Sequence, residues 1–76
     1  MIRYDEHAEF QLARRGIDKA SVEETIRNPA ATEAEGHRLS YLKCLPDRHV
    51  MLRVVVPAND PEFVITAYFD RTKPCV

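Results

Sequence analysis

The sequence predicts an α+β domain in which two N-terminal helices pack on one face of a three- to four-stranded antiparallel sheet. Apolar residues at helical spacing with capping residues come first in the chain, and stretches with a period of two follow. The 76 residues suffice for one domain, spanning 1–76. Hydrophobic residues make up 45% and charged residues 30% of the chain, which is typical of a globular protein and excludes a disordered one.

Capping residues set the expected helix boundaries. Asp5 is a plausible N-cap for a helix that runs to about Arg15, and Gly16 follows at a position that favours a left-handed C-cap. Asp18 is a suitable N-cap for a second helix over about 19–27. Asn28-Pro29 ends that helix, since the residue before a proline is disfavoured in the α conformation.

Four stretches predict strands, in chain order about 30–35, 38–45, 49–56 and 63–70. In the last two, one face is wholly apolar and is expected beneath the helices: Val50, Leu52, Val54 and Val56, then Phe63, Ile65, Ala67 and Phe69. The loops between consecutive strands are short, which predicts antiparallel pairing. The opposite sheet face is expected to be open and to carry Arg53, Thr66 and Tyr68.

Charge and cysteine content limit the possible partners. The net charge is −1, and the residues from 37 onward carry only a mild basic excess, below that of a dedicated nucleic-acid binder. Cys44 and Cys75 are expected to be reduced thiols, and no metal site or cofactor is predicted. No apolar run is long enough to cross a membrane and the N-terminus lacks a signal-peptide core, so we expect a cytoplasmic protein with no membrane partner.

A set of short motifs in a fixed order covers nearly the whole chain. They are His7-Ala8, Arg15-Gly16-Ile17-Asp18, Val22, Ile26, Gly36, Tyr41, Val54-Val55 and Ile65-Thr66-Ala67-Tyr68. Their order and spacing resemble a small bacterial family, domain of unknown function 4258. This resemblance implies a fold similar to RelE and ParE type toxins and to the wider group of small metal-independent ribonucleases. The net charge of −1 departs from the strongly basic pattern of RelE-like toxins.

Four residues are the candidates for catalysis: His7, Arg15, Arg53 and Tyr68. Metal-independent RNA cleavage needs a base for the ribose 2′-OH and an acid for the leaving oxygen, and a histidine can serve as either. Arginines would stabilise the charge on the cleaved phosphate, and a tyrosine beside an arginine can stack a base. The structural alternatives are a partly buried helix histidine, an arginine that caps its helix, and a simple Arg53–Tyr68 stack.

The candidates for binding nucleic acid are Arg14, Arg38, Arg53 and Tyr68. The sequence thus indicates a toxin-like RNA-binding protein, with metal-independent endoribonuclease activity of a toxin–antitoxin system as the expected chemistry. The alternative is a non-enzymatic protein-interaction module, or a degenerate toxin fold, that binds a partner on the open sheet face or at an edge strand. RNA or an antitoxin-like protein is the expected partner, and the oligomeric state is left open.

Overall fold

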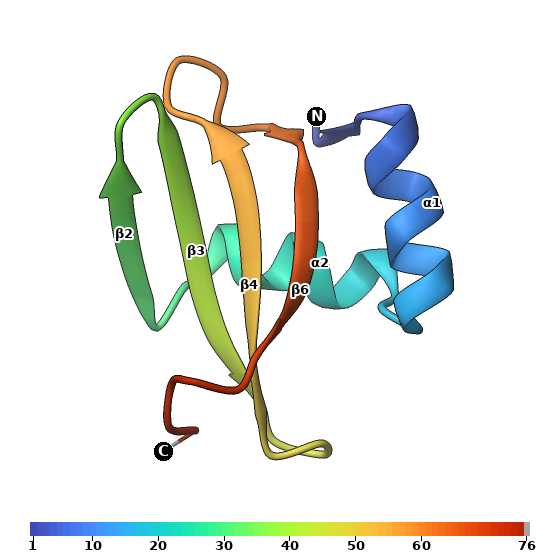
Figure 1. The fold of residues 1–76 in the computed structure, drawn as a ribbon, viewed down its shortest axis with the longest axis vertical. Helices are drawn as coiled ribbons and strands as arrows, with labels where there is room; N and C mark the ends of the chain where they lie inside the picture. The colour runs from blue at the N-terminus through green and yellow to red at the C-terminus, as the bar shows by residue number, and fades with distance from the viewer. Residues whose placement is uncertain (76) are drawn as a thin grey trace.

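The computed structural model, which describes residues 1–75, has two helices and a four-stranded antiparallel sheet, as predicted (Figure 1). The elements in chain order are β1 (Arg3–Tyr4), α1 (Glu6–Arg15), α2 (Lys19–Arg27), β2 (Ala31–Glu35), β3 (Arg38–Leu45), β4 (Val50–Pro57), β5 (Phe63–Val64) and β6 (Thr66–Asp70). No helix among the described residues is long and apolar enough to cross a membrane.

The two helices lie where the sequence predicts them, although the side chain of Asp5, the expected N-cap of α1, makes no capping hydrogen bond. Gly16 ends α1 in the left-handed conformation, with φ 68° and ψ 33°. The carboxylate of Asp18 accepts a hydrogen bond of 3.1 Å from the backbone N–H of Ser21 and so caps the start of α2. Ile17 and Val22 are both buried on either side of this cap, which fixes the angle at which the chain enters α2.

The four-stranded sheet has the order β2-β3-β4-β6, with each neighbouring pair antiparallel. The predicted strands over 30–35, 38–45 and 49–56 are therefore confirmed to within a residue. Gly36 begins the two-residue turn between β2 and β3 with φ 62°, a backbone conformation that glycine adopts without strain.

The predicted strand over 63–70 is interrupted at Ile65, and this part of the prediction is wrong. The N–H of Ile65 donates to Val55 O at 2.9 Å, while the next residue, Thr66, is the register partner of Val55. Two residues therefore oppose one, and the alternation of side chains shifts by one position. Val64 is fully buried in place of Phe63 and Ile65, and β5 pairs in parallel with β1, a pairing that the sequence analysis missed.

The main core lies between the helices and one face of the sheet. Its buried members are Ala8, Leu12, Ile17, Val22, Leu52, Val54, Val56, Val64 and Ala67. In Figure 1, α2 crosses behind the strands and α1 stands beside β6. The face of β4 predicted to lie beneath the helices is buried at all four positions, so the register of this strand is confirmed.

The sheet face opposite the helices is less open than predicted. After β6 the chain turns toward the β2 side of the sheet (Figure 1), where Lys73 pairs with Glu33 and Cys75 forms a disulfide with Cys44. The expectation of two reduced thiols is therefore wrong for this structure. The turn after β6 brings the two Cα atoms to 5.3 Å, within the usual range for a disulfide, whereas their separation of 31 residues gave no sign of it.

Candidate functional site

Arg53 occupies the centre of the sheet face opposite the helices and is largely buried. Its register partners are Leu42 on β3 and Tyr68 on β6. Only 13% of its side chain is exposed. The expectation that Arg53 lies at an exposed strand position is therefore wrong, because carboxylates from the two outer strands surround its guanidinium group.

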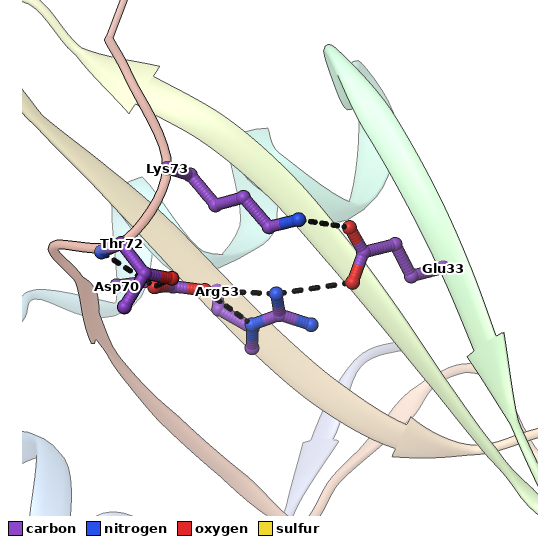
Figure 2. Close-up of polar contacts among 5 residues, drawn as sticks. All are labelled: Glu33, Arg53, Asp70, Thr72 and Lys73. Atoms are coloured by element: carbon purple, nitrogen blue, oxygen red, sulfur yellow. Dashed lines mark hydrogen bonds and ion pairs between the residues drawn. The ribbon is translucent and has the colours of Figure 1, made fainter.

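Figure 2 shows the polar network around Arg53. Its Nε and Nη2 atoms lie 2.9 and 2.8 Å from Oδ2 of Asp70. Nη2 also lies 3.1 Å from Oε1 of Glu33, whose Oε2 is 2.9 Å from Nζ of Lys73. Two cations thus meet two carboxylates, and the charge of this cluster is balanced.

The pKa values in this network favour the ionised forms. The hydroxyl of Thr72 and the guanidinium of Arg53 lower the pKa of Asp70 from 3.8 to about 2. Hydrogen bonds from Lys73 and Arg53 lower the pKa of Glu33. Burial alone would lower the pKa of Arg53, but its hydrogen bonds to Asp70 and Glu33 outweigh burial and raise it. At neutral pH the guanidinium group of Arg53 is paired with these two carboxylates. This pairing reduces the capacity of Arg53 to bind a phosphate.

A polar stripe on α1 contains two other predicted site residues. His7, Gln11 and Arg15 are spaced four residues apart and so share one face of the helix. His7 is exposed, and its Nε2 lies 3.3 Å from Nε2 of Gln11. Arg15 is eight residues further along, or about 12 Å along the helix axis. His7, the candidate acid–base group, and Arg15, the candidate cation, are therefore more than two helical turns apart.

Arg15 joins this stripe to the sheet. Its Nη1 donates to Thr66 Oγ1 at 3.3 Å and to the backbone carbonyl of Ala67 at 2.8 Å. Tyr68, two residues after Thr66 on the same face of β6, is 37% exposed. The structure therefore brings Arg15 and Tyr68 to the same strand.

The remaining two candidates lie apart from each other. Arg14 is exposed in the last turn of α1, beside Arg15 in the chain. Arg38 is exposed at the start of β3, where its register partner on β4 is Pro57. Four residues of β4, about 13 Å of strand, separate this position from Arg53. The cationic candidates thus do not form one cluster.

The bond between Arg15 and Ala67 also covers one edge of the sheet. β6 is the last strand, so the carbonyl that Arg15 reaches points away from β4. α1 packs along this strand, as Figure 1 shows. The backbone of β6 is therefore shielded on its outer side.

At the other end of the sheet, β2 pairs on one side only with β3, and no strand within residues 1–75 lies against its outer side. One register row links the two edges: Thr32, Tyr41, Val54 and Ala67. In antiparallel pairs, backbone groups of successive residues point to alternate sides. The Ala67 carbonyl points away from β4, so the alternation across this row makes the N–H and C=O groups of Thr32 point away from β3. The backbone groups of Ala34, two residues further along β2, point the same way.

A hollow of about 210 Å³ lies between the α1–α2 turn and the loop after β3. Arg48 donates to the carbonyl of Gly16 at 3.2 Å and stacks over the ring of Phe69 at 5.2 Å from its centroid. This contact was not predicted, because nothing in the local sequence pattern places residue 48 beside the end of α1. Arg48 already interacts with protein groups here, so the hollow adds no evident ligand site.

Metal-ion chemistry has no candidate centre in the described part of the chain. Within residues 1–75, no three His, Cys, Asp or Glu side chains lie close enough together to hold an ion.

Comparison with protein families gives a match over most of the chain. The model of the family described as domain of unknown function (DUF4258) matches residues 4–69, which covers both helices and nearly all of the sheet. The comparisons with curated proteins and with solved structures give no significant match.

Proposed function

The chain belongs to the DUF4258 family, and we propose that it is a non-enzymatic binding module that adds an extended segment of a partner protein to the outer edge of β2. The observation that carries this proposal is the difference between the two edges of the sheet. Arg15 and α1 cover the backbone of β6, whereas Thr32 and Ala34 direct their backbone groups outward from β2. Unpaired N–H and C=O groups in a row are a template for another strand.

The polar network around Arg53 favours this function over catalysis. A ribonuclease needs cations that are free to meet the developing phosphate charge. Arg53 instead contacts Asp70 and Glu33, and His7 has Gln11 as its hydrogen-bond partner. The net charge of −1 likewise suits a protein partner better than a polyanion.

A peptide selection with a variant of the edge tests the proposal. A random library of displayed ten-residue peptides is selected on the full chain, and the enriched peptides are then measured on Ala34→Pro and Ala34→Val. Proline removes the outward N–H of residue 34 without removing a bond of the fold, and valine keeps that N–H. We expect at least a tenfold weaker affinity for Ala34→Pro and nearly unchanged affinity for Ala34→Val. Failure to enrich any peptide, or equal binding to both variants, would contradict docking at this edge.

RNA binding is a second candidate function, favoured because the side chain of Arg15, from α1, reaches the strand β6 that carries Tyr68. Arg15 is fixed against β6 by two hydrogen bonds, and the part-exposed ring of Tyr68 follows two residues after Thr66. A fixed cation beside an exposed aromatic ring suits single-stranded nucleic acid. This candidate retains the relationship to RelE and ParE type toxins of bacterial toxin–antitoxin systems, and with it a cytoplasmic location.

Fluorescence anisotropy with labelled single-stranded RNA separates the two functions. If RNA binds at β6, Tyr68→Ala and Arg14→Glu should weaken binding, and Arg14→Glu should also reduce the salt dependence. Arg27→Ala is the matched control, because this arginine lies on α2 and pairs with Glu23. Any cleavage should persist in EDTA, leave a 2′,3′-cyclic phosphate and slow about 100-fold in His7→Ala. Absence of binding at low salt would eliminate the RNA candidate.

A further inference from the structure

Residues 71–75 cross the sheet face opposite the helices and are attached to it at three points. The N–H and hydroxyl of Thr72 donate to Oδ1 of Asp70 at 3.0 and 2.5 Å. Lys73 then reaches Glu33 on β2, and Cys75 is bonded to Cys44 on β3. The segment thus starts at one edge strand of the sheet and extends over β4 and β3 toward the other (Figure 2).

Two apolar side chains lie on the part of the sheet that this segment crosses. Leu42 and Met51 alternate with the residues that face the helices, so they point to the opposite side. They are nevertheless only 2% and 9% exposed. Cys44 is the register partner of Met51, and Leu42 is two residues from Cys44 on the same face. The disulfide therefore holds the segment beside this apolar pair.

The disulfide is the strongest of the three attachments. Lys73 and Glu33 are 40% and 42% exposed, and a solvent-exposed ion pair of this kind contributes little. The contacts of Thr72 are local, because Asp70 is only two residues away in the chain. The main core contains neither Cys44 nor Cys75, so the helices and the sheet do not depend on the disulfide for their packing.

We propose that Cys44 and Cys75 form a thiol-reversible latch, a site of modification by small thiols or dithiols that controls exposure of Leu42 and Met51. This inference is independent of the function proposed above. Reduction releases residues 71–75 and uncovers the apolar pair, and oxidation closes the segment over it again. The cytoplasm, the location expected from the sequence, contains thiols that keep most cysteines reduced, so the latch would respond to the redox state of the cell.

The reaction is thiol–disulfide exchange. A thiolate of the reductant attacks one sulfur of the Cys44–Cys75 bond, which breaks as a mixed disulfide forms. A second thiol of the reductant attacks that mixed disulfide, and the reductant leaves as its own disulfide. The protein gains two electrons and two protons and ends with two thiols. Oxidised glutathione reverses the same steps.

Nuclear magnetic resonance on the full chain tests the latch with dithiothreitol as the reductant. A water-soluble paramagnetic agent reports the exposure of methyl groups, and heteronuclear NOE values report the order of residues 71–75. On reduction we expect the relaxation enhancement at Leu42 and Met51 to rise severalfold and the NOE values of the segment to fall to those of a disordered chain. Leu52, fully buried on the helix side, is the internal control and should not change.

Two variants separate the disulfide from the ion pair. Cys75→Ser should show the open state without reductant, whereas Lys73→Ala, with its disulfide intact, should stay closed. A segment that remains ordered in Cys75→Ser and in the reduced chain would overturn the latch. Loss of protection at Leu52 on reduction would also overturn it, because the disulfide would then be needed for the fold.

Reversibility is measured with mixtures of reduced and oxidised glutathione and mass spectrometry of the trapped thiols. We expect the fraction of disulfide to follow the ratio of the two forms in both directions. A disulfide that stays intact in reduced glutathione alone would show a permanent crosslink and overturn the proposal.

Discussion

Arg53 and Asp70 form a diagonal bridge between the neighbouring strands β4 and β6. Two nitrogens of the guanidinium group, Nε and Nη2, lie 2.9 and 2.8 Å from the same carboxylate oxygen of Asp70. The direct register partner of Arg53 is Tyr68, so Asp70 is the diagonal neighbour two residues further along β6. The same carboxylate accepts from Thr72, which links the bridge to the turn after the strand.

Removal of this bridge should destabilise the fold. In Arg53→Met the aliphatic part of the side chain is preserved, but Asp70 loses its guanidinium partner. We expect a loss of about 1–3 kcal/mol, the range for a buried acceptor left without its donor. Urea titration at neutral pH measures the loss. Arg38→Met, at an exposed position of β3, is the control and should change stability by less than about 0.5 kcal/mol. Equal effects of the two substitutions would contradict a structural role for Arg53.

The depressed pKa of Asp70 predicts a specific dependence of stability on acid. This carboxyl group has a pKa of about 2 in the folded chain against an ordinary value of 3.8, so the folded state holds the proton less tightly than the unfolded state. Its stabilising effect is therefore complete above pH 3.8 and is lost as the pH falls toward 2. The difference in unfolding free energy between the wild type and Asp70→Asn should shrink across this range. A constant difference in urea titrations across the same range would show that Asp70 has no depressed pKa.

Leu52 is the best single probe of the main core. It is fully buried on the helix face of β4, and Leu52→Ala leaves a cavity in a small core. We expect a loss of roughly 2–5 kcal/mol, which would unfold a large fraction of a domain of this size. Thr32→Ala, on the exposed strand β2, is the control. Denaturant titration followed by circular dichroism compares them, and a loss below 1 kcal/mol for Leu52→Ala would contradict the core assignment.

Gly16 should be sensitive to substitution through its backbone alone. Its φ of 68° is a conformation that other residues rarely adopt, while an added Cβ would meet no atom within 4 Å. Gly16→Ala should therefore cost about 1–2 kcal/mol, the penalty for an L-residue in the left-handed region. Gly16→Asn should cost less, because asparagine tolerates that region better. Thermal unfolding measures both variants, and a larger loss for asparagine would point to a steric cause instead.

Local rules predicted most of the fold, because the information lay within a few residues. Asp18 and Gly16 bound the helices through caps that depend on the nearest turn of the chain. The alternation along β4 placed Leu52, Val54 and Val56 beneath the helices correctly. The shift at Ile65 was not predictable in this way, because it depends on the bond to Val55 and on the pairing of β5 with β1, both contacts between distant segments.

The candidate site was predicted less well for the same reason. The residue types were read from the chain, but the partners of Arg53 come from β2 and from the end of β6. When an arginine occupies a polar position in the alternating pattern of a strand, that pattern does not show whether carboxylates from other strands will lie near it. The approach of Arg15 to β6 likewise depends on how α1 packs against the sheet. The reduced state of Cys44 and Cys75 was predicted from the expected cellular compartment. Their pairing depends instead on the path of the chain after β6.

The unequal edges of the sheet also bear on stoichiometry. A sheet with two free edges can accept a strand at each side, and identical copies can then join end to end without limit. Here Arg15 and α1 cover β6, so the open edge of the four-stranded sheet, among residues 1–75, is that of β2. Two identical copies could then join only through their β2 edges, and the combined sheet would end in a covered β6 at each side. The fold therefore favours closed one-to-one complexes over filaments.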